Sequence, residues 1–318
     1  RQVKDLLAQL QHSRNKLMDK NEVAIFKKYD SISGRYTIGL TILGIFGILA
    51  TVIAQIWLNL SNVDLSANKS RTNYFLFTME YFIDQQKYYY LIMLHSHVAV
   101  YFGTILMVAT GTMMIMYIHH TCGMFRVAKY RIEHAVNFNI RRNMIPNSAI
   151  FMAQGIICAV DMHRQAIKLN KNFMSVLEKM MFCLIACAVA CLSLNMFQVS
   201  YLHIAYLCSE TSFQLAFEKD VKKLVMPFTR TLVCVIYMYL ANLMGQIVID
   251  HNNQVFDTAY NVDWFKTPVH VQKMILFLLQ RRSKEFALNV GGVYDASIQN
   301  FATLVKASVS YFTVICST

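Results

Sequence analysis

Three cysteines, Cys183, Cys187 and Cys191, recur at every fourth position of one apolar stretch. This spacing places the three thiols on one face of a helix. Thiolates bind zinc, but the stretch has no His or carboxylate at ligand spacing, and the sequence has no Cys-x-x-Cys pair. Because free Cys commonly behaves as a small buried hydrophobe, we interpret these thiols as packing residues.

Three histidines, His119, His120 and His134, raise the same question of a metal site. His119 and His120 lie where apolar sequence gives way to basic sequence, beside Tyr117 and without an acidic residue near them. This setting indicates a cluster at a membrane boundary, since tyrosine is enriched there. We therefore expect no metal and no cofactor.

The sequence also lacks the patterns that carry catalysis. It has no nucleophile elbow, phosphate-binding glycine loop, His-Glu-x-x-His pattern or paired carboxylates in a plausible site. We do not expect an enzyme.

One apolar run near the C-terminus contains a single charged residue, Lys306. Residues three or four apart in this run share a helical face. That face carries Ala307, Ser310, Tyr311, Val314 and Ser317. Small and hydroxylated side chains on one stripe can line an ion path, with an apolar ring that gates by dewetting. They can equally permit close helix packing, and the residues alone leave both interpretations open. A charge inside a membrane is costly, which makes Lys306 a candidate functional residue.

The composition of the chain indicates which class of fold carries these residues. The chain has 318 residues, of which 56% are hydrophobic and 15% are charged, against roughly 25% charged in an average soluble domain. With 3 Pro and 11 Gly, the chain has few of the residues that the many turns of a β protein need. The net charge of +12 lies in loops between apolar runs, without a nucleic-acid-binding motif. The expected class is an all-α, polytopic membrane bundle, and we expect no nucleic-acid partner.

Five stretches reach the roughly 20 apolar residues that a bilayer-spanning helix needs. They are residues 36–57, 88–118, 180–207, 228–248 and 298–316. Residues 1–35 suggest a cytoplasmic helix and a second short helix ahead of the first span, without a secretory signal. We find neither repeats nor linkers and predict one domain over residues 1–318.

The loop charges predict the orientation of these spans. Residues 1–35 and 119–175 each carry eight Lys and Arg, whereas residues 58–87 carry three. The positive-inside rule then places the two basic regions in the cytoplasm, and five spans carry the C-terminus outside. Asn59 and Asn68 head glycosylation sequons in the outer loop, and Asn68 is the better acceptor because Asn59 lies close to the membrane.

The C-terminal sequence resembles the signature of insect odorant receptors. The matching positions are Tyr260, Trp264, Pro268, the Arg281-Arg282-Ser283-Lys284 cluster, Gly291, Gly292, Phe301, Lys306 and the stretch 308–314. The resemblance is close over residues 253–316 and looser elsewhere. One departure is Phe265, where the family often has Tyr.

The resemblance implies a seven-span fold with the N-terminus inside. The run from Glu22 to Tyr29, followed by Gly34 and Arg35, is similar to the approach to the family's third span. The five stretches would then be spans three to seven, with the first two missing. The implied function is a ligand-tuned subunit that binds volatile odorants and gates a non-selective cation channel, in a heterotetramer with the shared co-receptor. Its implied location is the plasma membrane of sensory neuron cilia and dendrites.

The resemblance also assigns roles to particular residues. It implies a gate at Val314, an outer ring near Ser317 and a cytoplasmic anchor helix over residues 268–290, where subunits meet. Gly291 and Gly292 would relieve steric limits at the turn into the pore helix. Because a Lys would hinder cations at the narrowest point, we expect Lys306 below the gate, facing the vestibule or an adjacent subunit.

The family's ligand pocket lies in the outer half of the bundle, and a volatile ligand needs a mostly apolar pocket with few polar groups. The positions selected are Ala50, Ile53, Trp57, Tyr90, Met93, Leu94, His97, Tyr101, Val233 and Tyr237. His97 and Tyr101 stand four apart and could share a hydrogen bond. Each of these side chains can equally be an ordinary core or membrane-interface residue.

Three other classes compete with this interpretation. A gustatory-type channel usually has a Thr-Tyr pair and a Gln-Phe ending in its last span, where this chain has Ser310-Tyr311-Phe312. A G-protein-coupled receptor would have a cytoplasmic C-terminus and usually an Asp-Arg-Tyr or Asn-Pro-x-x-Tyr motif, and neither is present. A secondary transporter commonly shows repeats, which are also absent.

Overall fold

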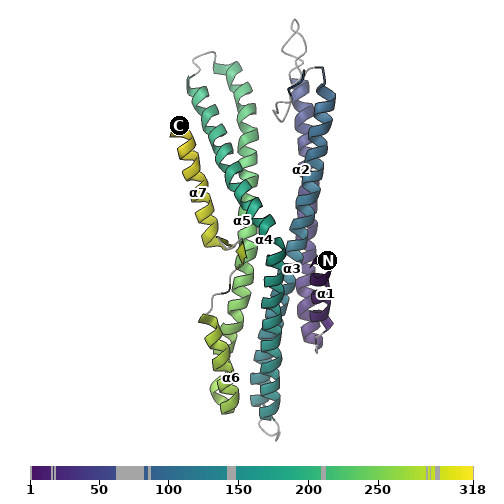
Figure 1. Ribbon diagram of the computed structural model, residues 1–318, viewed down its shortest axis with the longest axis vertical. Coiled ribbons are helices and arrows are strands. Elements are labelled where there is room, and N and C mark those ends of the chain that lie inside the picture. The colour runs from purple at the N-terminus through teal and green to yellow at the C-terminus, as the bar shows by residue number, and fades with distance from the viewer. Residues whose placement is uncertain are drawn as a thin grey trace. The chain divides into compact units, whose positions relative to one another are not determined.

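The protein is described by a computed structural model, and almost all of the residues that it describes are helical (Figure 1). The structure describes residues 2–15, 17, 19–61, 82–84, 87–141, 148–208, 213–283, 286, 288–290 and 294–317. The α-helices are α1 (Gln2–Asn15), α2 (Lys20–Ser61), α3 (Tyr89–Arg141), α4 (Ser148–Cys208), α5 (Phe213–Asn261), α6 (Val269–Gln280) and α7 (Ile298–Ser317). The shorter elements are the 3-10 turns η1 (Trp264–Lys266) and η2 (Arg281–Ser283) and the strands β1 (Asn289–Val290) and β2 (Tyr294–Asp295).

Four helices contain stretches long and apolar enough to cross a membrane. They are Lys20–Trp57 of α2, Tyr89–Asn137 of α3, Lys179–Phe197 of α4 and Thr231–Asn261 of α5. This confirms the predicted all-α membrane bundle. The predicted span 298–316 lies in α7, a single helix of 20 residues that is not among these four. Gln299, Asn300 and Lys306 lower the mean hydropathy of this helix.

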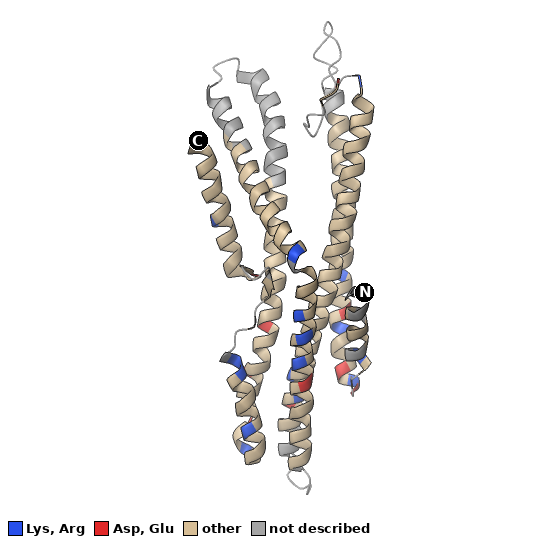
Figure 2. Ribbon diagram, in the orientation of Figure 1, with Lys and Arg blue, Asp and Glu red and all other residues tan. Residues whose placement is uncertain are grey.

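The long helices continue well beyond the thickness of a bilayer. α4 has 61 residues, which at 1.5 Å per residue is about 90 Å, or about three times a hydrocarbon core. Its charged side chains all lie between Asp161 and Lys179, in the first half of the helix (Figure 2). α2 likewise has no charged residue after Arg35. The second short helix expected within residues 1–35 is wrong, because those residues form the first turns of α2.

The chain divides into two compact units, where the sequence predicted one domain. The first unit comprises Arg1–Lys27 and His120–Thr318, and the second comprises Lys28–His119. The second unit pairs α2 with the first part of α3. A Cβ on Gly44 would lie 2.8 Å from Val108, and one on Gly111 would lie 2.8 Å from Leu40. Glycine at these two crossings lets the helices approach closely, as small residues do in membrane bundles.

The core of the first unit is organised around α4, which contacts α1, α5, α6, α7 and β1. Its charged half supplies the buried side chains Ile156, Met162 and Phe173. α5 and α6 add Val248, Val255, Val271 and Ile275 to the buried set. By contrast, no residue in the most apolar window of α2 or α3 is buried within the chain. The densest packing therefore lies in the segments that carry the charges.

A buried histidine lies inside this core. A ring nitrogen of His163, Nε2, lies 2.9 Å from Oδ1 of Asn252, and the ring packs against Phe125 and Phe256 with centroids 5.4 and 5.2 Å away. Burial lowers the pKa of His163, the hydrogen bond to Asn252 opposes that shift, and the charge of Arg281 adds to it. His163 is therefore a neutral hydrogen-bond donor that joins α4 to α5.

A buried ion pair fastens the start of α2 to α3. Arg131 binds Glu22 through two parallel contacts, from Nε to Oε1 at 2.6 Å and from Nη2 to Oε2 at 2.9 Å. Its third nitrogen donates to the carbonyl of Cys158 in α4 at 3.1 Å. The side chains of Arg131 and Glu22 are only 11% and 4% exposed. Three helices therefore meet at one charge-assisted contact, which is the strong bidentate kind.

The substitution Glu22→Gln should strongly destabilise the protein, because it leaves the guanidinium of Arg131 buried without its counter-charge. We expect a loss of about 3–5 kcal/mol in the free energy of unfolding. Thermal unfolding of the purified protein in detergent measures the effect. The matched control is Glu133→Gln, which breaks the more exposed 3.9 Å pair with Lys129 and should change stability by about 1 kcal/mol or less. Equal losses in the two variants would contradict the prediction.

Candidate functional site

The signature residues between α5 and α6 form a compact turn. Trp264 lies in η1, and the hydroxyl of Thr267 donates to its carbonyl at 2.6 Å. Pro268 is the N-cap residue of α6, where a missing N–H costs nothing. The side chain of Gln272 donates back to the carbonyl of Thr267 at 2.8 Å. Tyr260, at the end of α5, is 65% exposed.

The predicted anchor helix over residues 268–290 is too long. α6 ends at Gln280 and is followed by η2, and Asn289–Val290 form β1 instead. β1 pairs antiparallel with β2, with Asn289 opposite Asp295 and Val290 opposite Tyr294. Backbone pairing in this hairpin removes these residues from the helix. Gly291 and Gly292 lie outside the described residues.

α7 packs against α4 through its small residues. Ser308 is fully buried, and the hydroxyl of Ser193 in α4 donates to its backbone carbonyl at 3.1 Å. The hydroxyl of Ser308 donates to the carbonyl of Leu304 in its own helix at 2.9 Å. Phe301 and Phe312 lie half-buried on the same side. The sequence pattern alone does not show that Ser308 is buried and Ser310 exposed, since both fit a stripe of small residues.

The predicted pore residues lie on the other side of α7. Ser310 and Ser317 are exposed, Tyr311 and Val314 are 60% and 56% exposed, and Ala307 is half-buried. In Figure 1, α7 lies beside α4 and α5, which it contacts. Within the first unit, the described helices therefore leave most of this stripe uncovered.

Lys306 also points away from the core of its unit, since its side chain is exposed. It precedes Val314 by eight residues, which is about 12 Å along the helix axis and about 80° around it. Lys306 and the predicted gate are therefore separated both along the helix axis and around it.

The predicted ligand residues of α2 and α3 lie in the second unit. Ile53 and Trp57 are each 63% exposed, and Tyr90, Leu94 and Tyr101 are 77%, 64% and 50% exposed. Ala50 is exposed, whereas Met93 and His97 are half-buried. Nδ1 of His97 lies 2.9 Å from the Met93 carbonyl, so it carries the ring proton.

A buried polar pair that sequence analysis missed joins these two helices. The amide of Gln55 donates to the hydroxyl of Tyr89 at 3.1 Å, and the two residues are 3% and 4% exposed. Tyr89 is adjacent to the predicted Tyr90, and only the helix rotation distinguishes them. A Gln within an apolar run is the sequence signal that could have found the pair.

Two further predicted ligand residues lie in α5 of the first unit. Val233 is 60% exposed and Tyr237 is half-buried. Of the predicted glycosylation sites, Asn68 lies outside the described residues, and Asn59 lies near the end of α2.

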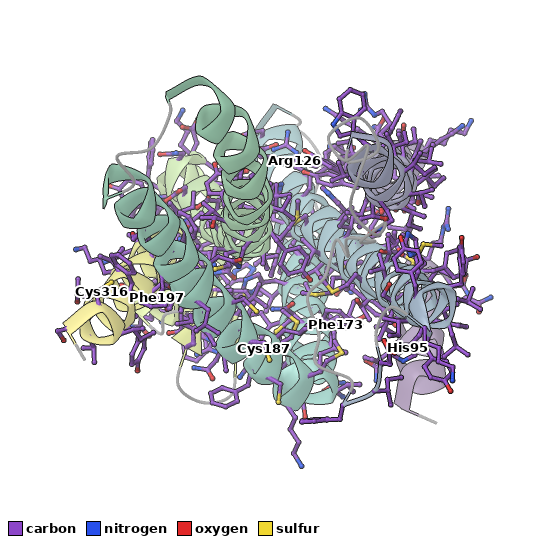
Figure 3. All side chains as sticks on the ribbon, turned by 90° about the horizontal axis from the view of Figure 1, so that it is seen from above. His95, Arg126, Phe173, Cys187, Phe197 and Cys316 are labelled. Carbon is purple, nitrogen blue, oxygen red and sulfur yellow. The ribbon has the colours of Figure 1, made fainter. Side chains whose placement is uncertain are left out.

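The three thiols predicted to pack are exposed instead. Cys183, Cys187 and Cys191 lie on an open face of α4, and Cys316 is exposed at the end of α7 (Cys187 and Cys316 are labelled in Figure 3). Thiols tolerate an apolar solvent, so such a face suits lipid or another helix as well as a core. Within the described residues, no three His, Cys, Asp or Glu side chains form a group that could hold a metal ion.

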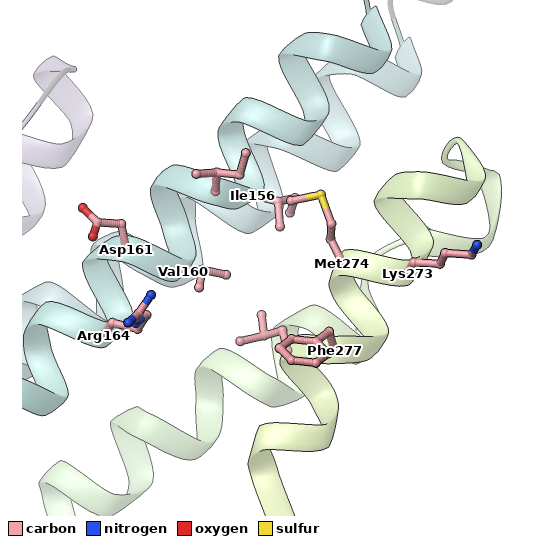
Figure 4. A pocket seen from close by; sticks show the side chains of 9 residues that line it. Ile156, Val160, Asp161, Arg164, Lys273, Met274 and Phe277 are labelled. Carbon is pink, nitrogen blue, oxygen red and sulfur yellow. The ribbon is translucent and has the colours of Figure 1, made fainter.

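A groove with a volume of about 580 Å³ lies between α4 and α6. Its apolar lining includes Ile156, Val160, Met274 and Phe277, and Figure 4 shows Met274 reaching toward Ile156. Asp161, Arg164 and Lys273 also line it. Leu276 and Phe277, on the outer side of α6, are 59% and 78% exposed. This combination of groove and apolar helix face is open in the isolated chain.

Comparison with known proteins gives matches to odorant and olfactory receptors. A family profile described as "7tm Odorant receptor" matches residues 1–309. Curated relatives include Putative odorant receptor 85d and Odorant receptor 30a of Drosophila melanogaster, 20% identical over 116 residues and 35% identical over 65 residues. Odorant receptor 10 of Aedes albopictus is 26% identical over 92 residues. These matches cover 36%, 20% and 26% of this chain and 28%, 17% and 24% of the relatives. The matched stretches thus span less than a third of each relative.

Solved structures show the same fold. The insect olfactory receptor OR5 from Machilis hrabei matches with a TM-score of 0.60 and 14% identity, over 99% of this chain and 74% of that chain. Its complex with eugenol matches with a TM-score of 0.58 and 13% identity, over 100% and 74%. At this identity the likeness concerns the arrangement of the helices alone.

Ser308 and Ser310 of α7 should lose stability to different extents when they are enlarged. Ser308→Leu forces a larger side chain into the contact with Ser193 and should destabilise the protein by about 1–3 kcal/mol. Ser310→Leu, on the exposed face, should change stability by about 0.5 kcal/mol or less. Thermal unfolding in detergent measures both, and a larger loss for Ser310→Leu would show that α7 packs in another rotation.

Proposed function

The chain belongs to the seven-transmembrane odorant receptor family, and we propose that it is a ligand-tuned subunit of an odorant-gated cation channel. In this proposal it binds a volatile odorant within the membrane bundle and opens its pore in a heterotetramer with the shared co-receptor. The observation that carries the proposal is the two-sided character of α7. One side is fixed to α4 through Ser308, and on the other side Ser310, Val314 and Ser317 are exposed.

The open side of α7 supplies what a narrow ion path needs. If four such helices surround an axis, Val314 can form an apolar ring that gates by dewetting, with the hydroxyls of Ser310 and Ser317 on either side of it along the helix. Lys306 lies about 12 Å before the gate and about 80° around the helix from it. This separation supports a position for Lys306 beside a neighbouring subunit or a wider vestibule. A cation would then pass the narrow ring without meeting the ammonium group there.

The odorant site is proposed for the outer halves of α2, α3 and α5. The residues assigned to it are mainly aromatic or aliphatic, and they include one imidazole, His97. Such a lining suits a small volatile molecule with one polar group. Because Nδ1 of His97 bonds to the Met93 carbonyl, Nε2 is the nitrogen left to accept a hydrogen bond from a ligand hydroxyl.

Subunit assembly is proposed for the cytoplasmic end of the molecule. The exposed Leu276 and Phe277 of α6 and the groove beside them form an apolar surface. Apolar surface of this kind marks an interaction site when it lies in water. In the proposal, a neighbouring subunit covers it.

The orientation proposed places the charged halves of α2, α3 and α4 in the cytoplasm. The eight Lys and Arg of residues 1–35 and the eight of residues 119–175 support it through the positive-inside rule. The C-terminal end of α7 then lies outside. A multi-pass location in the plasma membrane of sensory neuron cilia or dendrites follows from the proposed role.

Co-expression with the co-receptor tests the function directly. A fixed mixture of volatile phenols, alcohols and esters, including eugenol, is applied to cells that express the full-length receptor with or without the co-receptor. We expect ligand-evoked cation current only when both are present. An antibody against a C-terminal tag should label unpermeabilised cells, and an equal current without the co-receptor or a tag reached only after permeabilisation would contradict the proposal.

Substitution of the proposed gate tests the role of α7. Val314→Ala shortens the apolar side chain, which makes the constriction easier to wet and should raise the current in the absence of ligand. The control is Val309→Ala, at a position 39% exposed outside the pore stripe, which should leave that current unchanged. Both are measured against the amount of receptor at the cell surface. Equal effects of the two substitutions would remove the case for Val314 as the gate.

A further inference from the structure

Tyr294 of β2 reaches α5 through its hydroxyl, which donates a hydrogen bond to Oδ1 of Asn242. Asn242 is 4% exposed, and its side-chain nitrogen donates to the carbonyl of Met238 in the same helix at 2.9 Å. Both ends of this amide are therefore engaged inside the bundle. Burial raises the pKa of Tyr294 to about 12, so its hydroxyl stays protonated at neutral pH. Loss of this donor would leave a buried amide oxygen without its partner, which is unfavourable.

The same face of α5 receives the backbone that follows Tyr294. Gly245 and Gln246 come three and four residues after Asn242, which places all three on one helical face. A Cβ on Gly245 would fall on the carbonyl oxygen of Ala296 and 2.7 Å from its Cβ. The side chain of Gln246 accepts a hydrogen bond from the backbone N–H of Ile298, the first residue of α7, at 3.4 Å. The glycine is needed here because the backbone of the hairpin occupies the space of a side chain.

The link from this contact to α7 is short and internally bonded. The backbone N–H of Asn300 donates to the hydroxyl of Ser297 at 3.2 Å, as in an N-cap. The side chain of Asn300 donates back to the carbonyl of Asp295 at 2.7 Å. Ala296 donates to the carbonyl of Leu288 across the base of the hairpin at 2.9 Å. The hairpin and the first turn of α7 therefore form one bonded piece.

α5 connects this piece to the proposed odorant site. Tyr237, assigned to the ligand, comes five residues before Asn242, a rise of about 7.5 Å. Tyr239 packs edge-on against Phe301 of α7, with ring centroids 5.6 Å apart. A displacement of α5 at the level of the ligand thus acts at the base of the pore helix one to two turns away.

We propose that Tyr294 and Asn242 form a coupling latch, a pair of positioning residues through which α5 moves the base of α7 when ligand binds. The latch rests on the proposed function, because it requires α7 to carry the gate. It assigns a role in gating to two residues that touch neither the odorant nor the pore. Coupling between sites needs an element whose arrangement both sites bias, and the bonded hairpin is that element here.

The test is Tyr294→Phe, which keeps the ring and removes the hydroxyl. In cells that co-express the co-receptor, with the same volatile mixture as probe, we expect a roughly 2- to 10-fold higher EC50, the range that follows from losing one buried hydrogen bond. The maximal current per surface receptor should fall, and ion selectivity should not change. Asn242→Leu should do the same. The double variant should add nothing further, because the two side chains act through one contact.

The matched control is Tyr36→Phe, which removes a hydroxyl from a residue that is 48% exposed in α2. It should leave EC50 and maximal current unchanged. An unaltered dose response in Tyr294→Phe, beside a responsive unsubstituted receptor, would overturn the latch and leave the proposed function intact. Additive shifts in the double variant would also overturn it. Absence of current from the unsubstituted receptor with its co-receptor would overturn the proposed function and the latch together.

Discussion

The hydrocarbon of the bilayer is the constraint on which the rest of this structure depends. It contains no water, so a spanning segment must pair its own backbone N–H and C=O groups, and a single chain does so by forming helices. Polar side chains within the spans satisfy themselves in the same way. The hydroxyls of Thr41 and Thr104 each donate to a carbonyl four residues earlier, at 2.8 Å. Charged groups are confined to the ends of the apolar stretches, and the exception, Lys306, lies on an open face.

Packing differs along each helix as a consequence. The charged segments of α2, α3, α4 and α5 bury many large side chains and two polar pairs, Glu22 with Arg131 and His163 with Asn252. In the apolar stretch of α4, the hydrogen bond from Ser193 to the carbonyl of Ser308 holds α7 against α4. Segments with few buried contacts open at lower free energy than a dense core. A firm base with a lightly held α7 is therefore an arrangement in which α7, the proposed pore helix, can move while the rest of its unit stays folded.

Long apolar runs and loop charges made the helical membrane class predictable, and the C-terminal signature made the family predictable. The ends of the helices were harder to predict from the sequence. The start of α2 at Lys20 and the end of α6 at Gln280 depend on the packing of neighbouring segments. Asn289 and Val290, which were predicted to be part of the anchor helix, form a two-residue strand. The Cys183 stripe was expected to pack and is exposed. Helical spacing identifies which residues share a face but not what that face meets.

By itself, the sequence determined the composition of each helix face and the order of the spans, because periodicity and hydropathy are properties of a segment alone. Tertiary structure decided which face turns inward. It separated Ser308 from Ser310, buried Tyr89 rather than Tyr90, and left Lys306 exposed on α7. It also brought Tyr294 to Asn242, 52 positions away. Such contacts arise from the relative rotation and approach of whole helices, which depend on the packing of many side chains at once.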